Sequence, residues 1–220
     1  MFLSNLVESL IKPKSLSVMS GPCFSDEVAQ DLPTAATFAS SNTAIFDTIS
    51  GMLKSKKFRI YYSDDIIGCQ IGGALKNIYA IAAGISDGLN LGENARSALI
   101  TRSFVEITRF AIFFKSKKET LFGLSGLGDL MLTYNSSKSR NTNFGIKIAN
   151  IKHKNFEKEL DKNAITEGYF TAKAAIKIAT ENGIEMPILE SVFNILYNGF
   201  DIEDEINKLM SRTLTIENIN

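Results

Sequence analysis

Lys76 is the residue in this sequence whose surroundings best suit proton transfer. It lies in the middle of a nearly uncharged run, IIGCQIGGALKNIYAIAAGIS, at residues 66–86. At about 100° per residue, the helix face that carries Lys76 also carries Gly72 and Gly73, so this face is hollowed out. Partial removal from water favours the neutral amine of a lysine, which suits proton exchange with a substrate oxygen. A neighbouring helix packed on the glycines, with Lys76 reaching water or a carboxylate, explains the same pattern.

Ser139, Arg140 and Asn141 form a candidate phosphate site. They lie in KSRNTNFG, residues 138–145, where the pattern predicts the N-terminus of a helix. Free backbone N–H groups, the helix dipole and a guanidinium fork all favour a phosphate at such a place. A capping cluster with a surface arginine is the alternative.

Two glycine-containing segments supply further candidate groups. SGPCF, residues 20–24, closes a predicted strand and exposes backbone N–H groups at its carboxyl end, where α/β sheets bind ligands. GLSGLGDL, residues 123–130, allows a close approach of the backbone and then offers the carboxylate of Asp129. A plain turn and a capped helix start are the respective alternatives.

Composition narrows the possible chemistry. The chain has 24 Lys+Arg against 24 Asp+Glu, so no global field recruits nucleic acid or an anionic membrane. Two cysteines, Cys23 and Cys69, and one histidine give no zinc-ligand spacing and no disulfide framework, so we expect no metal site. The single histidine, His153, lies in a polar stretch that predicts a surface turn. We therefore expect the acid or base to be Lys, Asp or Glu.

The apolar run at residues 66–86 is about as long as a transmembrane helix. Its central Lys, Gln and Asn, and the acidic rather than basic flanks, argue against a membrane span. A helical spacing of three and four residues predicts a core-facing stripe of Ile67, Ile71, Leu75, Ile78, Ala82 and Ile85. The N-terminal stretch lacks the features of a signal peptide, so we expect a cytoplasmic protein.

The order of predicted elements indicates two domains. Up to residue 63, helices alternate with β-rich segments, which is typical of α/β layering. The predicted helices are one that ends at Ile11, one at residues 25–30 and one near residues 43–54, and the predicted strands are SLSVMSG, TAATFAS and FRIYY. From residue 64 to residue 220 long helical patterns dominate, at 64–86, 94–115, 140–150, 167–182, 187–197 and 201–211. We therefore place a domain boundary near residue 63.

In combination, these motifs resemble one family. SGPCF, IGCQIGGALKNIYAIAAGISDGLNLGENARSALITR, GLSGLGDLMLT, SRNTNFG and TEGYFTAK, in this order, are similar to the bacterial NAD(P)-dependent glycerol-3-phosphate dehydrogenases. The resemblance implies part of a Rossmann-type α/β domain at residues 1–63 and a mainly α-helical substrate domain at residues 64–220. It also implies interconversion of sn-glycerol 3-phosphate and dihydroxyacetone phosphate with NAD or NADP, for phospholipid synthesis.

The resemblance assigns roles residue by residue. Lys76 falls on the catalytic lysine, which exchanges a proton with the C2 oxygen of the substrate. The implied substrate-binding residues are Gly21, Cys23, Lys76, Asp129, Ser139, Arg140 and Asn141, and the implied cofactor-binding residues are Ser25, Arg140, Ile165 and Glu167. Cys23 stands where the family usually has Ser or Thr, so a weaker thiol contact replaces the hydroxyl contact. Ser25 replaces the usual alanine.

The pyrophosphate-binding G-x-G-x-x-G fingerprint of the family is not found in these 220 residues, nor is a second substrate-contacting lysine in a K-G motif. We expect the sequence to be a fragment whose strands SLSVMSG and TAATFAS lack partners, so that the isolated chain is inactive and aggregates through exposed edges. A separately encoded N-terminal half is then a possible partner. A non-catalytic phosphate-binding or dimerising remnant is the alternative function, and a sugar-acid phosphate dehydrogenase is disfavoured by the full GGALKN and NARSALITR motifs.

Overall fold

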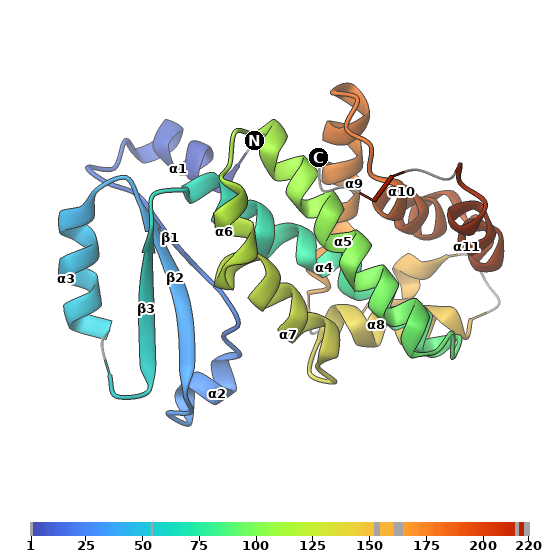
Figure 1. Ribbon diagram of the computed structural model, residues 1–220, viewed down its shortest axis with the longest axis horizontal. Helices are drawn as coiled ribbons and strands as arrows, with labels where there is room; N and C mark the ends of the chain where they lie inside the picture. The colour runs from blue at the N-terminus through green and yellow to red at the C-terminus, as the bar shows by residue number, and fades with distance from the viewer. Residues whose placement is uncertain (1, 54, 152–154, 161–164, 214–215, 218–220) are drawn as a thin grey trace. The chain divides into compact units, whose positions relative to one another are not determined.

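The protein was analysed as a computed structural model, which describes residues 2–53, 55–151, 155–160, 165–213 and 216–217 (Figure 1). The prediction of a surface turn at His153 lies outside the described residues. The chain divides into two compact units. Unit 1 comprises Met1–Gly73 and Ala111–Leu132, and unit 2 comprises Ala74–Phe110 and Thr133–Asn220. The boundary near residue 63 would place residues 64–73 and 111–132 in the helical domain. In the structure these residues group with the sheet, in unit 1.

Unit 1 is built around a three-stranded sheet of order β1-β2-β3. Its strands are β1 (Ser17–Ser20), β2 (Thr34–Ser40) and β3 (Phe58–Ser63). Its helices are α1 (Leu3–Ile11), α2 (Ser25–Ala29), α3 (Thr43–Leu53), α6 (Lys118–Phe122) and the π-helical turn η1 (Leu124–Gly128). All of the strands and helices predicted before residue 63 are confirmed, to within a few residues at their ends.

The pairing of the strands differs from the sequence-based expectation. The first two predicted strands do not lack partners, because β1 pairs antiparallel with β2, with Val18 opposite Ala39. Strand β3 pairs parallel to the other edge of β2. Helix α3 lies beside the sheet (Figure 1), and its Phe46 ring packs 5.2 Å from the Tyr62 ring of β3, measured between centroids.

Unit 2 is helical in all of its described regular elements. It holds α8 (Arg140–Ala149), the 3₁₀ turn η2 (Phe156–Glu159), α9 (Glu167–Glu181), α10 (Pro187–Phe193), the π-helical turn η3 (Asn194–Asn198) and α11 (Ile202–Met210). Three further helices have residues in both units: α4 (Ile66–Gly88), α5 (Glu93–Phe113) and α7 (Asp129–Asn135). The helices predicted after residue 63 are confirmed. Within GLSGLGDL, Leu124–Gly128 form the π-helical turn η1 and α7 begins at Asp129, so the alternative of a helix start holds for Asp129.

Helix α4 is buried on more than the predicted stripe. Ile71 and Ile78 are buried as expected, but Cys69, Tyr79 and Ala83 on other faces are fully buried as well. The predicted core-facing stripe is confirmed, since Ile71, Leu75, Ile78, Ala82 and Ile85 are buried and Ile67 is half-buried. Other segments cover further sides of α4 as well. By length and composition α4 is the one described helix able to cross a membrane, but 61% of its most apolar window is buried inside the protein, as in the core helix of a globular protein.

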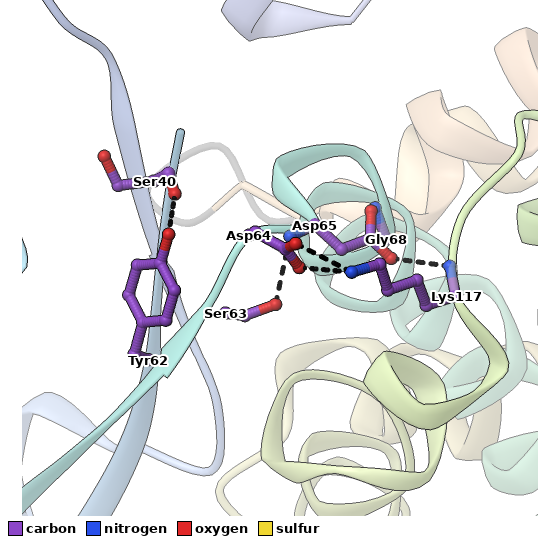
Figure 2. A network of polar contacts seen from close by, with 7 residues as sticks. All are labelled: Ser40, Tyr62, Ser63, Asp64, Asp65, Gly68 and Lys117. Atoms are coloured by element: carbon purple, nitrogen blue, oxygen red, sulfur yellow. Dashed lines mark hydrogen bonds and ion pairs between the residues drawn. The ribbon is translucent and has the colours of Figure 1, made fainter. Parts of the chain in front are cut away.

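The start of α4 is fixed by two adjacent aspartates with different environments (Figure 2). Asp65 is buried, and its carboxylate accepts hydrogen bonds from the backbone N–H of Gly68 (2.7 Å) and of Lys117 (2.8 Å). The first bond caps the helix, and the second ties its start to the segment that precedes α6. Asp64 is exposed, and its carboxylate pairs with the Lys117 ammonium at 2.7 Å, which holds the pKa of Asp64 below its usual value.

This contrast predicts that two neighbouring substitutions differ in their effect on stability. Asp65→Ala removes the acceptor of the buried Gly68 N–H and of the partly buried Lys117 N–H, and should lower the free energy of unfolding by about 1–3 kcal/mol. Asp64→Ala removes only a solvent-exposed ion pair and should have a much smaller effect. Urea denaturation followed by circular dichroism measures both, and equal losses would show that the Asp65 cap does not hold α4.

Gly72 of α4 is a point of close backbone approach. A Cβ atom built there would lie 2.1 Å from the carbonyl oxygen of Ser125 in η1, so no side chain fits. The glycine-rich 123–130 segment does bring its backbone close to a neighbour, and that neighbour is α4. The sequence left open whether the glycines of α4 make room for a ligand or for a neighbouring segment. At Gly72 the space is taken by a neighbouring segment. At Gly73 a Cβ would meet only the Ser20 Oγ atom within 4 Å, at 3.1 Å.

Gly72→Ala should therefore destabilise the protein although alanine favours helix. The backbone of η1 has to move, and such overpacking typically costs about 1–3 kcal/mol. Gly51 of α3 is the matched control, because its Cβ would meet nothing within 4 Å. Gly51→Ala should be neutral or stabilise by up to about 1 kcal/mol. Thermal denaturation distinguishes them, and a neutral Gly72→Ala would contradict the close approach.

Candidate functional site

Lys76 is a half-buried residue of α4 in unit 2, and it lies between Leu75, which is buried, and Asn77. The helix therefore holds its backbone rigidly, while the side chain retains access to solvent. This environment is compatible with contact between the amine and a small ligand.

Asn77, which directly follows Lys76, belongs to a hydrogen-bond network with Asn141. The Asn141 side chain is buried, and its Nδ2 donates to Asn77 Oδ1 at 3.0 Å and to Glu167 Oε2 at 3.5 Å. Its Oδ1 accepts the backbone N–H of Gly168 at 2.9 Å. A Cβ on Gly168 would lie 2.3 Å from the Asn77 carbonyl oxygen, so only glycine allows α9 to begin here. We call these four residues the asparagine network.

Ser139 and Arg140 form the start of α8. Ser139 is buried and its Oγ accepts the backbone N–H of Thr142 at 3.2 Å, so the capping interpretation is confirmed for this residue. Arg140 is half-exposed, and its guanidinium pairs with Glu167 Oε1 at 2.7 Å. Because both groups remain partly in water, an incoming anion can compete with Glu167 for the guanidinium.

The predicted cofactor residues on unit 2 are solvent-accessible. The side chain of Glu167 is 42% exposed, and Ile165, two residues earlier, is 65% exposed. Thr166 between them is buried. The segment thus places an apolar side chain and a carboxylate at the surface, next to Arg140.

The remaining predicted residues lie in unit 1. Gly21 follows β1 directly with a φ of +147°, as the turn SGPCF requires. Cys23 is half-buried and its thiol donates to the Ala35 carbonyl oxygen at 3.7 Å, while Ser25 is exposed at the start of α2. Asp129 is buried at the first residue of α7.

The structure therefore joins Asn141, Arg140 and Glu167 by direct hydrogen bonds, and it adds two residues that the sequence did not single out. Asn77 and Gly168 were missed although both lie in quoted motifs, GGALKN and TEGYF. Their adjacency to Lys76 and Glu167 was the available signal. Among the described residues no group of three or more His, Cys, Asp or Glu side chains is arranged to hold a metal ion.

Comparison with known families identifies the chain. Residues 65–207 match the NAD-dependent glycerol-3-phosphate dehydrogenase C-terminus, and residues 1–46 match the NAD-dependent glycerol-3-phosphate dehydrogenase N-terminus. The chain belongs to the NAD-dependent glycerol-3-phosphate dehydrogenase family. This confirms the family inferred from the motifs, and with it the α/β part of a Rossmann-type domain followed by a mainly helical domain.

Individual members of the family are similar over most of this chain. Glycerol-3-phosphate dehydrogenase [NAD(P)+] of Thiobacillus denitrificans is 44% identical over 91% of the chain, and that of Parvibaculum lavamentivorans is 40% identical over 99%. The crystal structure of glycerol-3-phosphate dehydrogenase from Coxiella burnetii superposes with a TM-score of 0.89 at 39% identity, covering 96% of the chain. The chain spans 61% and 65% of the length of the two relatives, and 65% of the crystallised chain.

The asparagine network predicts a stability difference within α8. Asn141→Ala removes the acceptor of the buried Gly168 N–H and one donor to Asn77 Oδ1, and should cost about 1–3 kcal/mol of the free energy of unfolding. Asn143→Ala is the control, because Asn143 is exposed and donates a single hydrogen bond to the Ser137 carbonyl oxygen. It should have a much smaller effect on the midpoint of urea unfolding. Equal effects would show that Asn141 does not hold α4, α8 and α9 together.

Proposed function

We propose that this chain carries the substrate-binding and proton-transfer residues of a glycerol-3-phosphate dehydrogenase that interconverts sn-glycerol 3-phosphate and dihydroxyacetone phosphate. The observation that supports this most directly lies within unit 2. Lys76 is followed by Asn77, and Asn77 is hydrogen-bonded to Asn141, the neighbour of Arg140. A candidate proton-transfer group and a candidate phosphate-binding group are thereby held on one rigid network.

Arg140 and the N-terminus of α8 are proposed to bind the phosphate of the substrate. The guanidinium offers a planar fork of donors that matches two phosphate oxygens, and the helix dipole favours the negative charge. The ion pair with Glu167 orients Arg140 before the substrate arrives. Because that pair is half-exposed, exchanging Glu167 for a doubly charged phosphate is electrostatically favourable.

Lys76 is proposed to exchange a proton with the C2 oxygen of the substrate. When the alcohol is oxidised, the neutral amine accepts the hydroxyl proton, and when the ketone is reduced, the ammonium returns it. A nicotinamide cofactor, NAD or NADP, supplies or accepts the hydride at C2. Gly21, Cys23 and Asp129 are proposed as further substrate contacts, as the family resemblance implies, with the thiol of Cys23 in place of a hydroxyl.

The cofactor is proposed to contact Ser25, Arg140, Ile165 and Glu167. Their chemistry fits such a ligand, because the exposed Ile165 offers an apolar surface for a ring and Arg140 offers positive charge for a phosphate. The relatives named above are described as NAD(P)+ enzymes. We also propose a role in phospholipid precursor synthesis. We further propose a cytoplasmic location, with which the largely buried α4 is consistent.

The test uses the chain joined to the N-terminal part of the Thiobacillus relative, since this chain spans 61% of that protein. The joined protein should reduce dihydroxyacetone phosphate with NADH or NADPH. Lys76→Met should lower kcat by about 10²–10⁴-fold, because a general acid–base group is lost, and should leave the cofactor Kd nearly unchanged. Absorbance of the reduced cofactor measures kcat, and fluorescence titration measures Kd.

Lys177→Met is the matched control, because the Lys177 side chain is 75% exposed on α9. It should retain the activity of the parent. A Lys76→Met variant that keeps most of the parent kcat would show that Lys76 is a structural lysine, and an inactive parent that still binds cofactor would contradict the proposed activity.

A further inference from the structure

Glu106 is a buried carboxyl group in unit 2 for which the proposed chemistry has no use. It lies on α5 with only 2% of its surface exposed. Its Oε2 accepts the Tyr79 hydroxyl of α4 at 3.0 Å and the Leu189 N–H at 3.1 Å, and its Oε1 accepts the Ile188 N–H at 2.7 Å. Ile188 and Leu189 follow Pro187, the first residue of α10. One carboxyl group thus connects α4, α5 and the start of α10.

The three hydrogen-bond donors to Glu106 are electrically neutral. The positive charge that acts on Glu106 is that of Arg109, three residues further along α5, and the Arg109 guanidinium donates to the Glu185 carbonyl oxygen. On α10 the charged side chain is Glu190, which pairs with Lys208 at 2.8 Å. The carboxylate of Glu106 is therefore stabilised by dipoles rather than by a counter-ion, and its burial is incompletely compensated.

Burial raises the pKa of Glu106 from 4.5 to about 7, against the opposing effect of the hydrogen bonds from Ile188, Leu189 and Tyr79. The pKa of Tyr79 is also raised, because its hydroxyl is buried beside Glu106, so Tyr79 remains a neutral donor. Glu106 consequently changes its charge near neutral pH, where an exposed glutamate does not.

We propose that Glu106 is a pH-sensitive latch, which holds the start of α10 against α4 and α5 at acidic pH and loosens as the pH rises through neutrality. Opening of the latch separates Ile188 and Leu189 from the carboxyl group and admits water. Hydration favours the ionised carboxylate, so between about pH 4.5 and pH 7 opening releases the proton that the closed form holds. By mass action, opening becomes more favourable as the pH rises.

The sign follows from linkage. In the closed form Glu106 binds its proton more tightly than in water, so the contribution to closure is complete below about pH 4.5 and is lost as the pH rises through about 7. The inference concerns the packing of unit 2 and does not depend on the proposed enzymatic activity.

Amide hydrogen exchange of the 220-residue chain tests the latch. The protection of Ile188 and Leu189, corrected for the intrinsic pH dependence of exchange, should fall by roughly 10–100-fold between about pH 5 and pH 8, given the raised affinity of Glu106 for its proton. These two amides should also be less protected than those of Phe144 and Ile148 in α8. Equal protection would mean that only global unfolding exposes them, and would overturn the proposal, as would protection that does not change with pH.

Three variants test whether Glu106 causes the pH dependence of protection at Ile188 and Leu189. Glu106→Gln keeps an acceptor but cannot ionise, so the pH dependence at Ile188 and Leu189 should disappear, and an unchanged dependence would overturn the proposal. His153→Gln removes the only histidine of the sequence, the other side chain that normally titrates in this range, and should change nothing. Loss of the pH dependence in His153→Gln would show that His153, and not Glu106, causes it, and would overturn the proposal.

Tyr79→Phe provides a test if Glu106→Gln fails to fold. It removes one donor to the carboxylate while keeping the aromatic ring, so the pKa of Glu106 should rise further. The fall in protection at Ile188 and Leu189 should then extend to higher pH than in the parent. A fall over the same pH range as in the parent would contradict the role of Glu106.

Discussion

The backbone of α4 has to be approached closely by other segments, and the rest of the structure depends on this constraint. In unit 1 the Ser125 carbonyl of η1 occupies the space where Gly72 has no side chain, and in unit 2 Gly168 lies against the Asn77 carbonyl. Contacts of this kind leave no room for a methyl group. They fix the position of each neighbouring segment along the helix, because a shift by one residue would place a side chain in the contact.

The proposed site follows from the second of these contacts. Since Gly168 rests on Asn77, the first turn of α9 brings its N–H and the Glu167 carboxylate to the buried amide of Asn141. Arg140 then reaches Glu167 at the surface. The site is therefore preorganised by buried amide hydrogen bonds, whereas the charged groups that would meet a phosphate stay partly in water and remain exchangeable.

Burial separates the roles of the acidic residues. Asp65 and Glu106 are both buried and both accept backbone N–H groups at the start of a helix, so they hold elements together. Asp64 and Glu167 are exposed and pair with cations that are themselves exposed. The same carboxyl chemistry serves packing in the first case and an adjustable surface charge in the second, because the energy of a charge depends on its access to water.

The sequence alone determined the helices and strands, since hydrophobic periodicity and turn residues are local, and the motifs determined the family and the candidate residues. It did not determine that β1 and β2 pair antiparallel, that Leu124–Gly128 form a helical turn that fills the hollow at Gly72, or that Asn77 is bonded to Asn141. Glycines at 126 and 128 are unfavourable in a helix, whereas in the structure the Ser125 carbonyl and Gly126 of this turn lie against Gly72 of α4. These features depend on contacts between residues far apart in the chain, and such contacts form only when the tertiary structure brings the segments together.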